Sequence, residues 1–435
     1  MATDGPILLI GRGDLAGEVR QGLDALDAEV VRLVDPTTRE VADVFERGPV
    51  AKAVVVSRDD AVAMRYALMV RHHDADVEML LTLFDRTVAE QLSERIEPVE
   101  ITSLADIVAP VLAGPCLDES LDALVVRGDR VLGVRADGER VVEEPVEVRS
   151  PSGGRLWLES ALRPFDRSAA LMFYGVVGLI LVLVLETLGA VIVIDQKPVD
   201  AFYGSAKALV TVGPNDAISK GPPAFKVVIG ALHLCALVFE AFFTAGIVNR
   251  LIDRRLTGLL GRRAVPRRDH VVVVGLGKVG MRLTALLRQA GAGVVAVDEQ
   301  EDGENVGSAR EQGLPVVVGR GADPSLLRRL SVTQARALAA VTDDDLQNVS
   351  IAMSALAINP DLRVILRVGD GRLANETRSL TRFGLVRDVH RIAAALIAAQ
   401  ATGSAAGRVV CGDDGEALLV HGDGRVEQAA MAAVS

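Results

Sequence analysis

Three closely spaced glycines follow a short apolar run that begins at Val271. The run Val271–Val274 predicts a buried strand, and an amphipathic pattern after the glycines predicts a helix to about Gln289. Glycines at this spacing let the backbone approach a pyrophosphate, and amides at the start of the helix attract its charge. The motif therefore predicts a phosphate cradle, formed by Gly275, Gly277, Lys278 and Gly280.

A carboxylate at the end of the next predicted strand supplies the second part of this chemistry. Gly293–Val297 is the strand, and Asp298 follows it, 18 positions after Gly280. A carboxylate at that place accepts hydrogen bonds from a ribose, so the segment predicts nucleotide binding. Glu299 comes next with no basic residue nearby, which favours NAD or an adenine nucleotide over NADP. The alternative is that the glycines serve only a tight turn.

The N-terminal segment repeats this arrangement. Gly11 and Gly13 follow the predicted strand Ile7–Ile10, and the next strand ends in Asp35. These residues predict a second, weaker nucleotide site, because Asp14 repels phosphate where the other copy has an attractive lysine. The alternative is a degenerate scaffold that packs against the other copy.

The repeat continues at a fixed spacing but with a deletion. Ala53–Asp60 aligns with Leu338–Asp345 at an offset of 285 residues. Between the second-strand acid and this block, the first copy is 22 residues shorter than the second. That difference is about the length of one strand and one helix. We therefore expect a shortened N-terminal copy and a full C-terminal copy.

Two long apolar stretches, Ala169–Ile194 and Val227–Val248, lie between the copies. A membrane crossing needs about 20 apolar residues at about 1.5 Å each, so both stretches qualify. Arginines precede the first stretch and follow the second, and positive flanks favour the cytoplasm. The sequence therefore predicts a multi-pass protein of the cell membrane, with two spans and both termini cytoplasmic.

The connection between the spans carries a short helical pattern and then a turn. We expect Asp200 to cap a helix over Ala201–Val210, followed by Thr211-Val212-Gly213-Pro214-Asn215-Asp216. Non-helical backbone at membrane depth is tolerated only where it lines a cavity or is buried in protein. This order of elements predicts a re-entrant loop over 200–216 that contributes to an ion pathway. The pathway residues of this loop are Thr211, Val212, Gly213, Pro214, Asn215 and Asp216.

Polar residues in the second span belong to the same prediction. His233, Glu240 and Thr244 lie near one helical face, and an acid within a membrane is a functional candidate. We predict that Glu240 supplies negative charge that concentrates cations. The alternative is that Glu240 pairs with His233 of a neighbouring subunit or stays protonated. Glu186, in the first span, is expected to face protein.

The composition narrows the classes of function. The chain of 435 residues has 47 Lys and Arg against 58 Asp and Glu, a net charge of −11, so no nucleic-acid partner is expected. Cys116, Cys235 and Cys411 are too far apart for a disulfide framework or a zinc cluster, and no metal site is predicted. A membrane-tethered dehydrogenase would need an acid–base pair in a cleft, and no histidine has that setting, so no enzyme is expected.

The segment Val271–Ala399 resembles the RCK domain, the regulator of potassium conductance, which is also called a potassium-uptake NAD-binding domain. The resemblance rests on Val-Gly-Leu-Gly-Lys-Val-Gly280, Val-Val-Gly319, Thr-Asp-Asp-Asp-Leu-Gln-Asn348 and Asn359-Pro-Asp-Leu-Arg-Val-Ile-Leu-Arg367. Ile7–Leu112 resembles a shortened copy of the same domain. The two spans with Thr-Val-Gly-Pro-Asn-Asp between them resemble the pore module of potassium channels.

This resemblance implies a fold class and an order of domains. The fold is α/β, with Rossmann-like RCK domains flanking an α-helical, two-transmembrane pore-type module. The expected order is an N-terminal RCK-like domain (1–150), a linker (151–168), the pore module (169–252), a basic linker (253–269), a C-terminal RCK domain (270–400) and a short tail (401–435).

The resemblance also implies partners, ligands and further site residues. It implies a homotetramer in the lipid bilayer, with a cytoplasmic gating ring that binds a small nucleotide ligand and pulls on the inner helices. The regulatory ligand would be NAD(H) or an adenine nucleotide (ATP or ADP), and the permeant ion K⁺ or another monovalent cation. Gly319, Thr342 and Asp343 would lie near the strand ends that flank the adenine.

The turn between the spans departs from the potassium-channel pattern, Thr-Val-Gly-Tyr-Gly, whose carbonyls replace the hydration shell of the ion. Pro214 and Asn215 stand at the tyrosine and second glycine. Asparagine tolerates left-handed backbone, but proline fixes φ. Two hypotheses follow: a nucleotide-gated, potassium-channel-like cation channel subunit, or a non-conducting membrane nucleotide sensor or regulatory subunit that has lost its selectivity filter.

Overall fold

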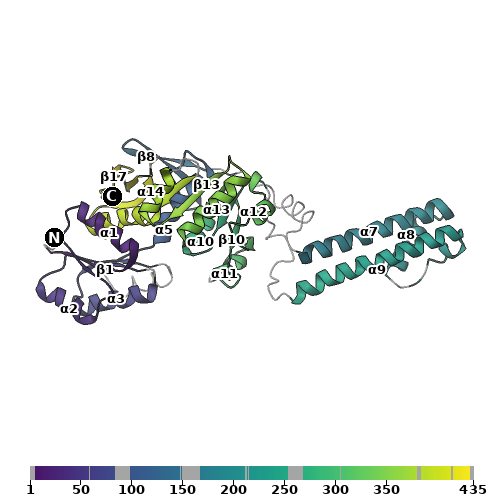
Figure 1. The fold of residues 1–435 in the computed structure, drawn as a ribbon, viewed down its shortest axis with the longest axis horizontal. Coiled ribbons are helices and arrows are strands. Elements are labelled where there is room, and N and C mark those ends of the chain that lie inside the picture. The colour runs from purple at the N-terminus through teal and green to yellow at the C-terminus, as the bar shows by residue number, and fades with distance from the viewer. Residues whose placement is uncertain are drawn as a thin grey trace. The chain divides into compact units, whose positions relative to one another are not determined.

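The computed structural model describes residues 5–57, 59–83, 98–146, 148, 167–210, 213, 215–252, 268–303, 305–379, 384–412 and 415–431. The chain divides into two compact units, one of Met1–Pro151 with Pro266–Ser435, the other of Ser152–Val265 (Figure 1). We call residues 5–148 the N lobe, 268–431 the C lobe and 167–252 the helical unit. Of the two predicted linkers, 151–166 and 253–267 lie outside the described residues.

The C lobe is built on a six-stranded parallel sheet of order β11-β10-β9-β12-β13-β14. Its strands are β9 (His270–Val274), β10 (Gly293–Asp298), β11 (Val316–Val318), β12 (Ala337–Ala340), β13 (Arg363–Val368) and β14 (Leu385–Asp388). Its helices are α10 (Lys278–Gln289), α11 (Val306–Glu311), α12 (Pro324–Arg329), η2 (Val332–Gln334), α13 (Asp345–Ile358) and α14 (Gly371–Ser379). The strand order reverses between β9 and β12, where ligands bind in open sheets of this type.

The N lobe has the same arrangement with one strand fewer. Its sheet has the order β2-β1-β3-β4-β5, all parallel. The elements are β1 (Ile7–Gly11), α1 (Gly13–Ala25), β2 (Val30–Leu33), α2 (Thr38–Arg47), β3 (Lys52–Val56), α3 (Asp60–His73), β4 (Glu78–Thr82) and β5 (Val99–Thr102). Where the C lobe has α11, β11 and α12, the N lobe has α2 alone, which confirms the predicted shortened copy.

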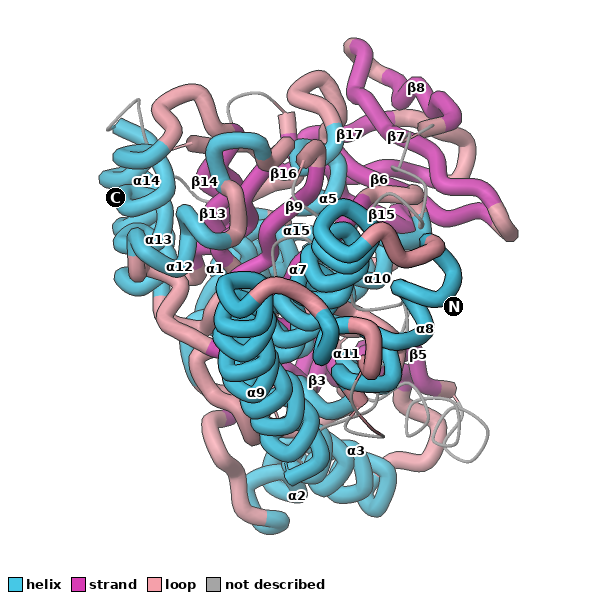
Figure 2. The backbone as a smooth tube through the Cα atoms, turned by 90° about the vertical axis from the view of Figure 1, so that its right-hand side faces the viewer, coloured by secondary structure: helices cyan, strands magenta, loops and turns pink. Residues whose placement is uncertain are grey.

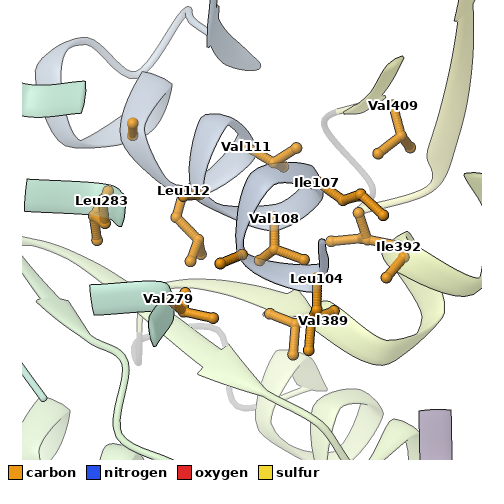
Figure 3. Packing of buried hydrophobic residues seen from close by; sticks show 14 of the residues in the cluster. Leu104, Ile107, Val108, Val111, Leu112, Val279, Leu283, Val389, Ile392 and Val409 are labelled. Carbon is orange, nitrogen blue, oxygen red and sulfur yellow. The ribbon is translucent and has the colours of Figure 1, made fainter. Parts of the chain in front are cut away.

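One crossing helix leaves each sheet and packs on the other lobe. Helix α5 (Leu104–Leu117) follows β5 and packs against α10, and α15 (Val389–Ala401) follows β14 and packs against α1. Figure 3 shows the core that these helices share, in which α5 meets Val279 and Leu283 on one side and Val389 and Ile392 on the other. Because both crossing helices are apolar nearly all round, each is stable only when it is enclosed by both lobes.

Basic side chains stabilise the C-terminal ends of both crossing helices. Lys52 Nζ lies 3.0 Å from the carbonyl oxygen of Gln400, at the end of α15. Arg363 Nη1 lies 3.3 Å from the carbonyl oxygen of Pro115, at the end of α5. A cation at this end of a helix interacts favourably with the helix dipole. Each lobe therefore contributes a cation to the helix that arrives from the other.

Each lobe ends in a small antiparallel sheet, seen in Figure 2. The N-lobe sheet comprises β6 (Ala123–Arg127), β7 (Arg130–Asp137) and β8 (Arg140–Pro145), and the C-lobe sheet comprises β15 (Ala406–Cys411), β16 (Ala417–His421) and β17 (Val426–Gln428). The two sheets share a small core of Ala123, Val134, Val410 and Val420. The segment 401–435, predicted as a short tail, therefore includes a folded sheet.

The helical unit contains α7 (Arg167–Ile194), α8 (Pro198–Leu209), the short η1 (Ile218–Lys220) and α9 (Pro223–Ile252). Leu171–Ile194 and Pro223–Val248 are long and apolar enough to cross a membrane, as the sequence predicted. Helix α8 begins at Pro198, so the prediction that Asp200 caps this helix is wrong. A proline at the first helical position already has the required φ, and Asp200 lies in the first turn.

Glycines on α7 set how closely α9 approaches. A side chain at Gly178 would overlap the ring of Phe239, and one at Gly175 would meet the backbone nitrogen of Phe243 at 2.6 Å. Gly189 is matched in the same way by the ring of Phe225. Small residues at such contacts bring two apolar helices together by van der Waals packing.

Candidate functional site

A cavity of about 470 Å³ opens at the carboxyl ends of β9, β10 and β12 in the C lobe. It lies where the strand order reverses, the usual ligand position in a doubly wound sheet. Six of the predicted nucleotide-site residues line it together: Gly275, Gly277, Lys278, Asp298, Thr342 and Asp343. Gly280 and Gly319 do not line it.

The three glycines of the motif have different roles in this cavity. Gly275 has φ of +101°, and a side chain there would meet the backbone nitrogen of Thr342 at 2.8 Å. Gly280 lies directly against the carbonyl oxygen of Gly275, so it lets α10 begin close to β9. A side chain at Gly277 would meet no atom within 4 Å, so the space above this residue is open. The space above Gly277 is the cradle that a phosphate would fill.

Backbone amides at the start of α10 complete this cradle. Gly277 is the N-cap of α10, and among the described residues no side chain caps this helix. The first amides of a helix carry partial positive charge and attract anions. Lys278, the first residue of α10, adds a formal positive charge at the same end of the helix. The residues present therefore fit a pyrophosphate.

Asp298 is fixed at the end of β10 by backbone amides. Its Oδ2 accepts a hydrogen bond from the Leu276 amide at 2.9 Å, and its Oδ1 accepts one from the Gln300 amide at 2.9 Å. A carboxylate has about four lone-pair sites, so it can still accept bonds from ribose hydroxyls. The Gly319 amide donates to the Asp298 carbonyl oxygen at 2.9 Å. Gly319 thus hydrogen-bonds to the end of β10, and Gly321 lines the cavity instead.

A buried amide orders the loop after β12. The Oδ1 of Asn348 accepts hydrogen bonds from the amide and the hydroxyl of Thr342, at 3.0 and 2.8 Å. Its Nδ2 donates to the carbonyl oxygens of Thr342 and Arg367, at 3.0 and 2.9 Å. Asn348 is fully buried, so this network holds Thr342 in place at the cavity wall.

The sequence prediction missed several wall residues. Arg367 lines the cavity, and its Nη1 hydrogen-bonds to the Thr342 carbonyl oxygen. Leu104 also lines it, although it belongs to α5 and so to the other copy of the repeat. The sequence carried no signal for this, because Leu104 lies far along the chain from the other residues of the cavity.

The corresponding acid in the N lobe already has partners from its own chain. Asp35 Oδ1 accepts a hydrogen bond from the Tyr66 hydroxyl at 3.0 Å, and its Oδ2 lies 3.5 Å from Arg12 Nη1. Gly13 has φ of +81°, whereas Gly277 at the equivalent place has φ of −63°, so the two turns differ in backbone conformation. A side chain at Gly11 would meet the carbonyl oxygen of Val56 at 2.5 Å. The weaker second site predicted at Gly11, Gly13 and Asp35 therefore has its glycines, but the carboxylate of Asp35 is already hydrogen-bonded to the Tyr66 hydroxyl.

The predicted ion pathway is described only in part, because Thr211, Val212 and Pro214 lie outside the described residues. Gly213 lies beside Lys207 of α8, and Asp216 is exposed. Asn215 is buried, packed on Gly204 of α8, with its Nδ2 3.4 Å from Gln196 Oε1. Its Oδ1 accepts a hydrogen bond from the Ala217 amide at 3.2 Å. The Asn215 side chain therefore anchors the end of the loop to the helices.

Two polar side chains, Glu186 of α7 and His233 of α9, contact each other between the helices. His233 Nε2 lies 3.1 Å from Glu186 Oε2, and Glu186 is fully buried. The expectation that Glu186 faces protein is confirmed. Glu240 and Thr244 are exposed on the flank of α9 that also carries His233.

Among the described residues, no group of three His, Cys, Asp or Glu side chains is placed to hold a metal ion. Cys116 and Cys411 are buried, and burial raises the pKa of these thiols to about 12 and about 11. Both therefore stay protonated at neutral pH, when a thiol is a weak nucleophile.

Comparisons with known proteins identify the class of the C lobe. A family model described as the TrkA-N domain matches residues 271–384. The voltage-gated potassium channel Kch of Escherichia coli is 25% identical over 41% of this chain and 43% of its own length. Potassium channel protein 1 of Methanocaldococcus jannaschii is 22% identical over 44% of this chain and 59% of its own length. The matches thus span about half the length of these two relatives.

Solved structures show the same fold over most of the chain. The GsuK channel covers 92% of this chain and 65% of its own, at 15% identity and a TM-score of 0.51. The GsuK channel bound to NAD covers the same shares at 13% identity and a TM-score of 0.51. The two lobes are therefore Rossmann-like domains of RCK type that flank a helical unit, as the motifs predicted. Residues 271–384 match the TrkA-N domain model, and the chain is similar to proteins named as potassium channels.

Proposed function

We propose that this protein is a nucleotide-regulated, potassium-channel-like cation channel subunit. The observation that carries the proposal is the joint presence, in one chain, of the C-lobe cavity and of two helices long enough to cross a membrane. Binding a nucleotide at the C lobe would shift an equilibrium between conformations of the helical unit. NAD(H), ATP and ADP are the ligands whose groups the cavity suits.

The cavity supports this ligand class through three features. The space above Gly277 and the start of α10 suit a pyrophosphate, and Asp298 suits ribose hydroxyls. Glu299 Oε2 accepts a hydrogen bond from Gln347 Nε2 at 3.0 Å, and its negative charge disfavours a 2′-phosphate. The expectation that no basic residue lies nearby is wrong, because Arg320 Nε is 3.6 Å from Glu299 Oε1, and this arginine offsets part of the repulsion between Glu299 and a 2′-phosphate. The GsuK channel bound to NAD has the same fold, which agrees with this choice.

The helical unit supports a membrane location and a polar pathway. One flank of α9 carries Lys226, His233, Glu240 and Thr244, while the side facing away from α7 carries apolar residues such as Leu234 and Val238. Polar residues in a membrane helix face water or protein rather than lipid. A homotetramer would bring four copies of this polar flank around one axis, with both termini cytoplasmic.

The altered turn at Pro214 and Asn215 supports a second candidate, a non-conducting membrane nucleotide sensor. Purified protein in liposomes, with a K⁺ or Na⁺ flux readout and with or without NAD(H), ATP or ADP, distinguishes the two. Flux that depends on nucleotide and is lost in Gly213→Val supports the channel. Nucleotide binding without flux of any cation supports the sensor, and the absence of both contradicts the proposal.

A further inference from the structure

The N lobe contributes part of the wall of the cavity in the C lobe. Leu104 lines this cavity, and Leu104 is the first residue of α5, the crossing helix that follows the N-lobe sheet and packs on α10. Its side chain is 3% exposed and belongs to the apolar core that the two lobes share. A molecule that fills the cavity as far as this wall therefore contacts both lobes.

An ion pair holds the first turn of α5 beside the helix that begins at the phosphate cradle. Arg282 Nε of α10 lies 2.7 Å from Oδ1 of Asp106, which is in the first turn of α5. Arg282 is four positions after Lys278, the first residue of α10. The pair therefore keeps the beginning of α5, and with it Leu104, close to the start of α10.

The course of α5 decides which end of the cavity Leu104 closes. Helix α5 packs on β12 and β13 as well as on α10, and the strands follow one another in the order β10-β9-β12-β13. Asp298 ends β10, and the cradle at Gly277 follows β9. Leu104 therefore lies on the side of the cradle opposite to Asp298.

The two ends of the cavity suit different parts of a nucleotide. With one ribose at Asp298 and the pyrophosphate at Gly277, a dinucleotide continues across the reversal of strand order toward β12. On that side Leu104 and Val341, which directly follows β12, offer apolar surface to a ring. ADP ends at the cradle, whereas NAD(H) has a second ribose and a nicotinamide ring to place beyond it.

We infer that Leu104 is a specificity-determining residue, supplied by the N lobe, which contacts the nicotinamide half of NAD(H) and so distinguishes NAD(H) from ADP. This inference rests on the proposed function, since it needs a nucleotide in the C-lobe cavity. A ligand that touches Leu104 also binds the N lobe. NAD(H) binding and the packing of α5 on α10 therefore stabilise each other, while ADP binding leaves this junction unchanged.

The test compares two leucines of the same helix in the full chain. Leu112 is eight positions after Leu104, is fully buried near Leu283, and does not line the cavity (Figure 3). We expect Leu104→Ala to weaken NAD(H) binding roughly tenfold, a change equivalent to about 1.4 kcal/mol, and to leave ADP affinity unchanged. Leu112→Ala should lower the melting temperature and leave both affinities unchanged. Isothermal titration and thermal unfolding measure these effects.

A conservative variant and a second readout separate ligand contact from general damage to the junction. Leu104→Met keeps the apolar volume, so it should keep the wild-type ratio of NAD(H) to ADP affinity. In wild type, NAD(H) should slow hydrogen exchange of the α5 amides, and ADP should not.

The outcomes separate this inference from the proposed function. An unchanged ratio of NAD(H) to ADP affinity in Leu104→Ala would overturn the inference alone, and so would an equal loss of NAD(H) affinity in Leu112→Ala. Wild-type protein that binds ADP but not NAD(H) would also contradict it. Wild-type protein that binds no nucleotide would overturn the proposed function together with the inference.

Discussion

The N lobe and the C lobe share the same order of parallel strands except for one missing strand, and a cavity of about 470 Å³ lies at the strand ends of the C lobe. The two lobes differ in the missing strand and also in one equivalent pair of residues. Tyr66 of α3 and Ile351 of α13 are aligned by the offset of 285. Ile351 lines the cavity, whereas the Tyr66 hydroxyl reaches Asp35. A repeat can therefore keep its glycines and acid and still fill the ligand position with its own side chain.

The largest expected effect is a loss of nucleotide affinity on substitution of Gly277, the central glycine of the C-lobe motif. Gly277 has φ of −63° and nothing within 4 Å of an added side chain, so Gly277→Val should fold normally. We expect it to weaken nucleotide binding by at least about 100-fold, because the side chain occupies the phosphate cradle. Isothermal titration with NAD(H), ATP and ADP measures this.

Gly13 supplies the contrasting variant. Its φ of +81° is strained for any other residue, so Gly13→Ala should cost about 1 kcal/mol of stability and leave nucleotide affinity unchanged. Loss of nucleotide binding in Gly13→Ala would break the comparison between the lobes.

The next effect concerns the two acids. Asp298→Ala should weaken nucleotide binding by about 10- to 100-fold, the value of one or two hydrogen bonds to a charged group. Asp35→Ala should leave affinity unchanged, since Tyr66 and Arg12 already occupy that carboxylate. An equal loss of nucleotide affinity in the two variants would indicate that both lobes bind nucleotide.

Removing the Tyr66 hydroxyl tests whether its hydrogen bond to Asp35 is what prevents a nucleotide from binding to the N lobe. Tyr66→Phe should lower the free energy of unfolding by about 1 kcal/mol, because the hydrogen bond from the buried tyrosine to the Asp35 carboxylate is lost. We expect the stoichiometry to stay at one nucleotide per chain, because the N lobe also lacks the strand equivalent to β11. A second bound nucleotide in Tyr66→Phe would show that the hydroxyl alone closes the site.

The smallest expected effect is on the pH dependence of the free energy of unfolding, to which Glu18 and Asp118 contribute with opposite signs. Burial, with Asp388 and Asp14, raises the pKa of Glu18 above 4.5, so folding loses stability as pH rises through the raised value. Glu18→Gln should therefore gain a few tenths of a kcal/mol over wild type between pH 4 and pH 8. Hydrogen bonds from Ser120 lower the pKa of Asp118, so its contribution is lost as pH falls.

Asp118→Asn is the matched control, measured by thermal unfolding across the same pH range. It should be less stable than wild type at pH 7 and should equal it near pH 2, where both states are protonated. The same sign of change for both variants would contradict the assignment of causes.

Much of the fold followed from local pattern. The run of valines before Gly275 and the period of the following helix predicted β9 and α10, and the count of residues before Asp60 and Asp345 predicted the missing strand. Strands buried on both faces and turns that need glycine leave strong local signals. The start of α8 was missed because a proline at Pro198 begins the helix without a capping side chain.

The sequence by itself determined the two α/β copies, the two apolar helices and the residues of the nucleotide motif, since each depends on neighbours within about 30 positions. Only the tertiary structure decided that α5 and α15 cross between the lobes, that Leu104 lines the cavity of the other copy, and that Tyr66 reaches Asp35. These contacts join residues far apart in the chain. Which apolar helix covers which sheet depends on how all the surfaces are buried together, and no local pattern records that.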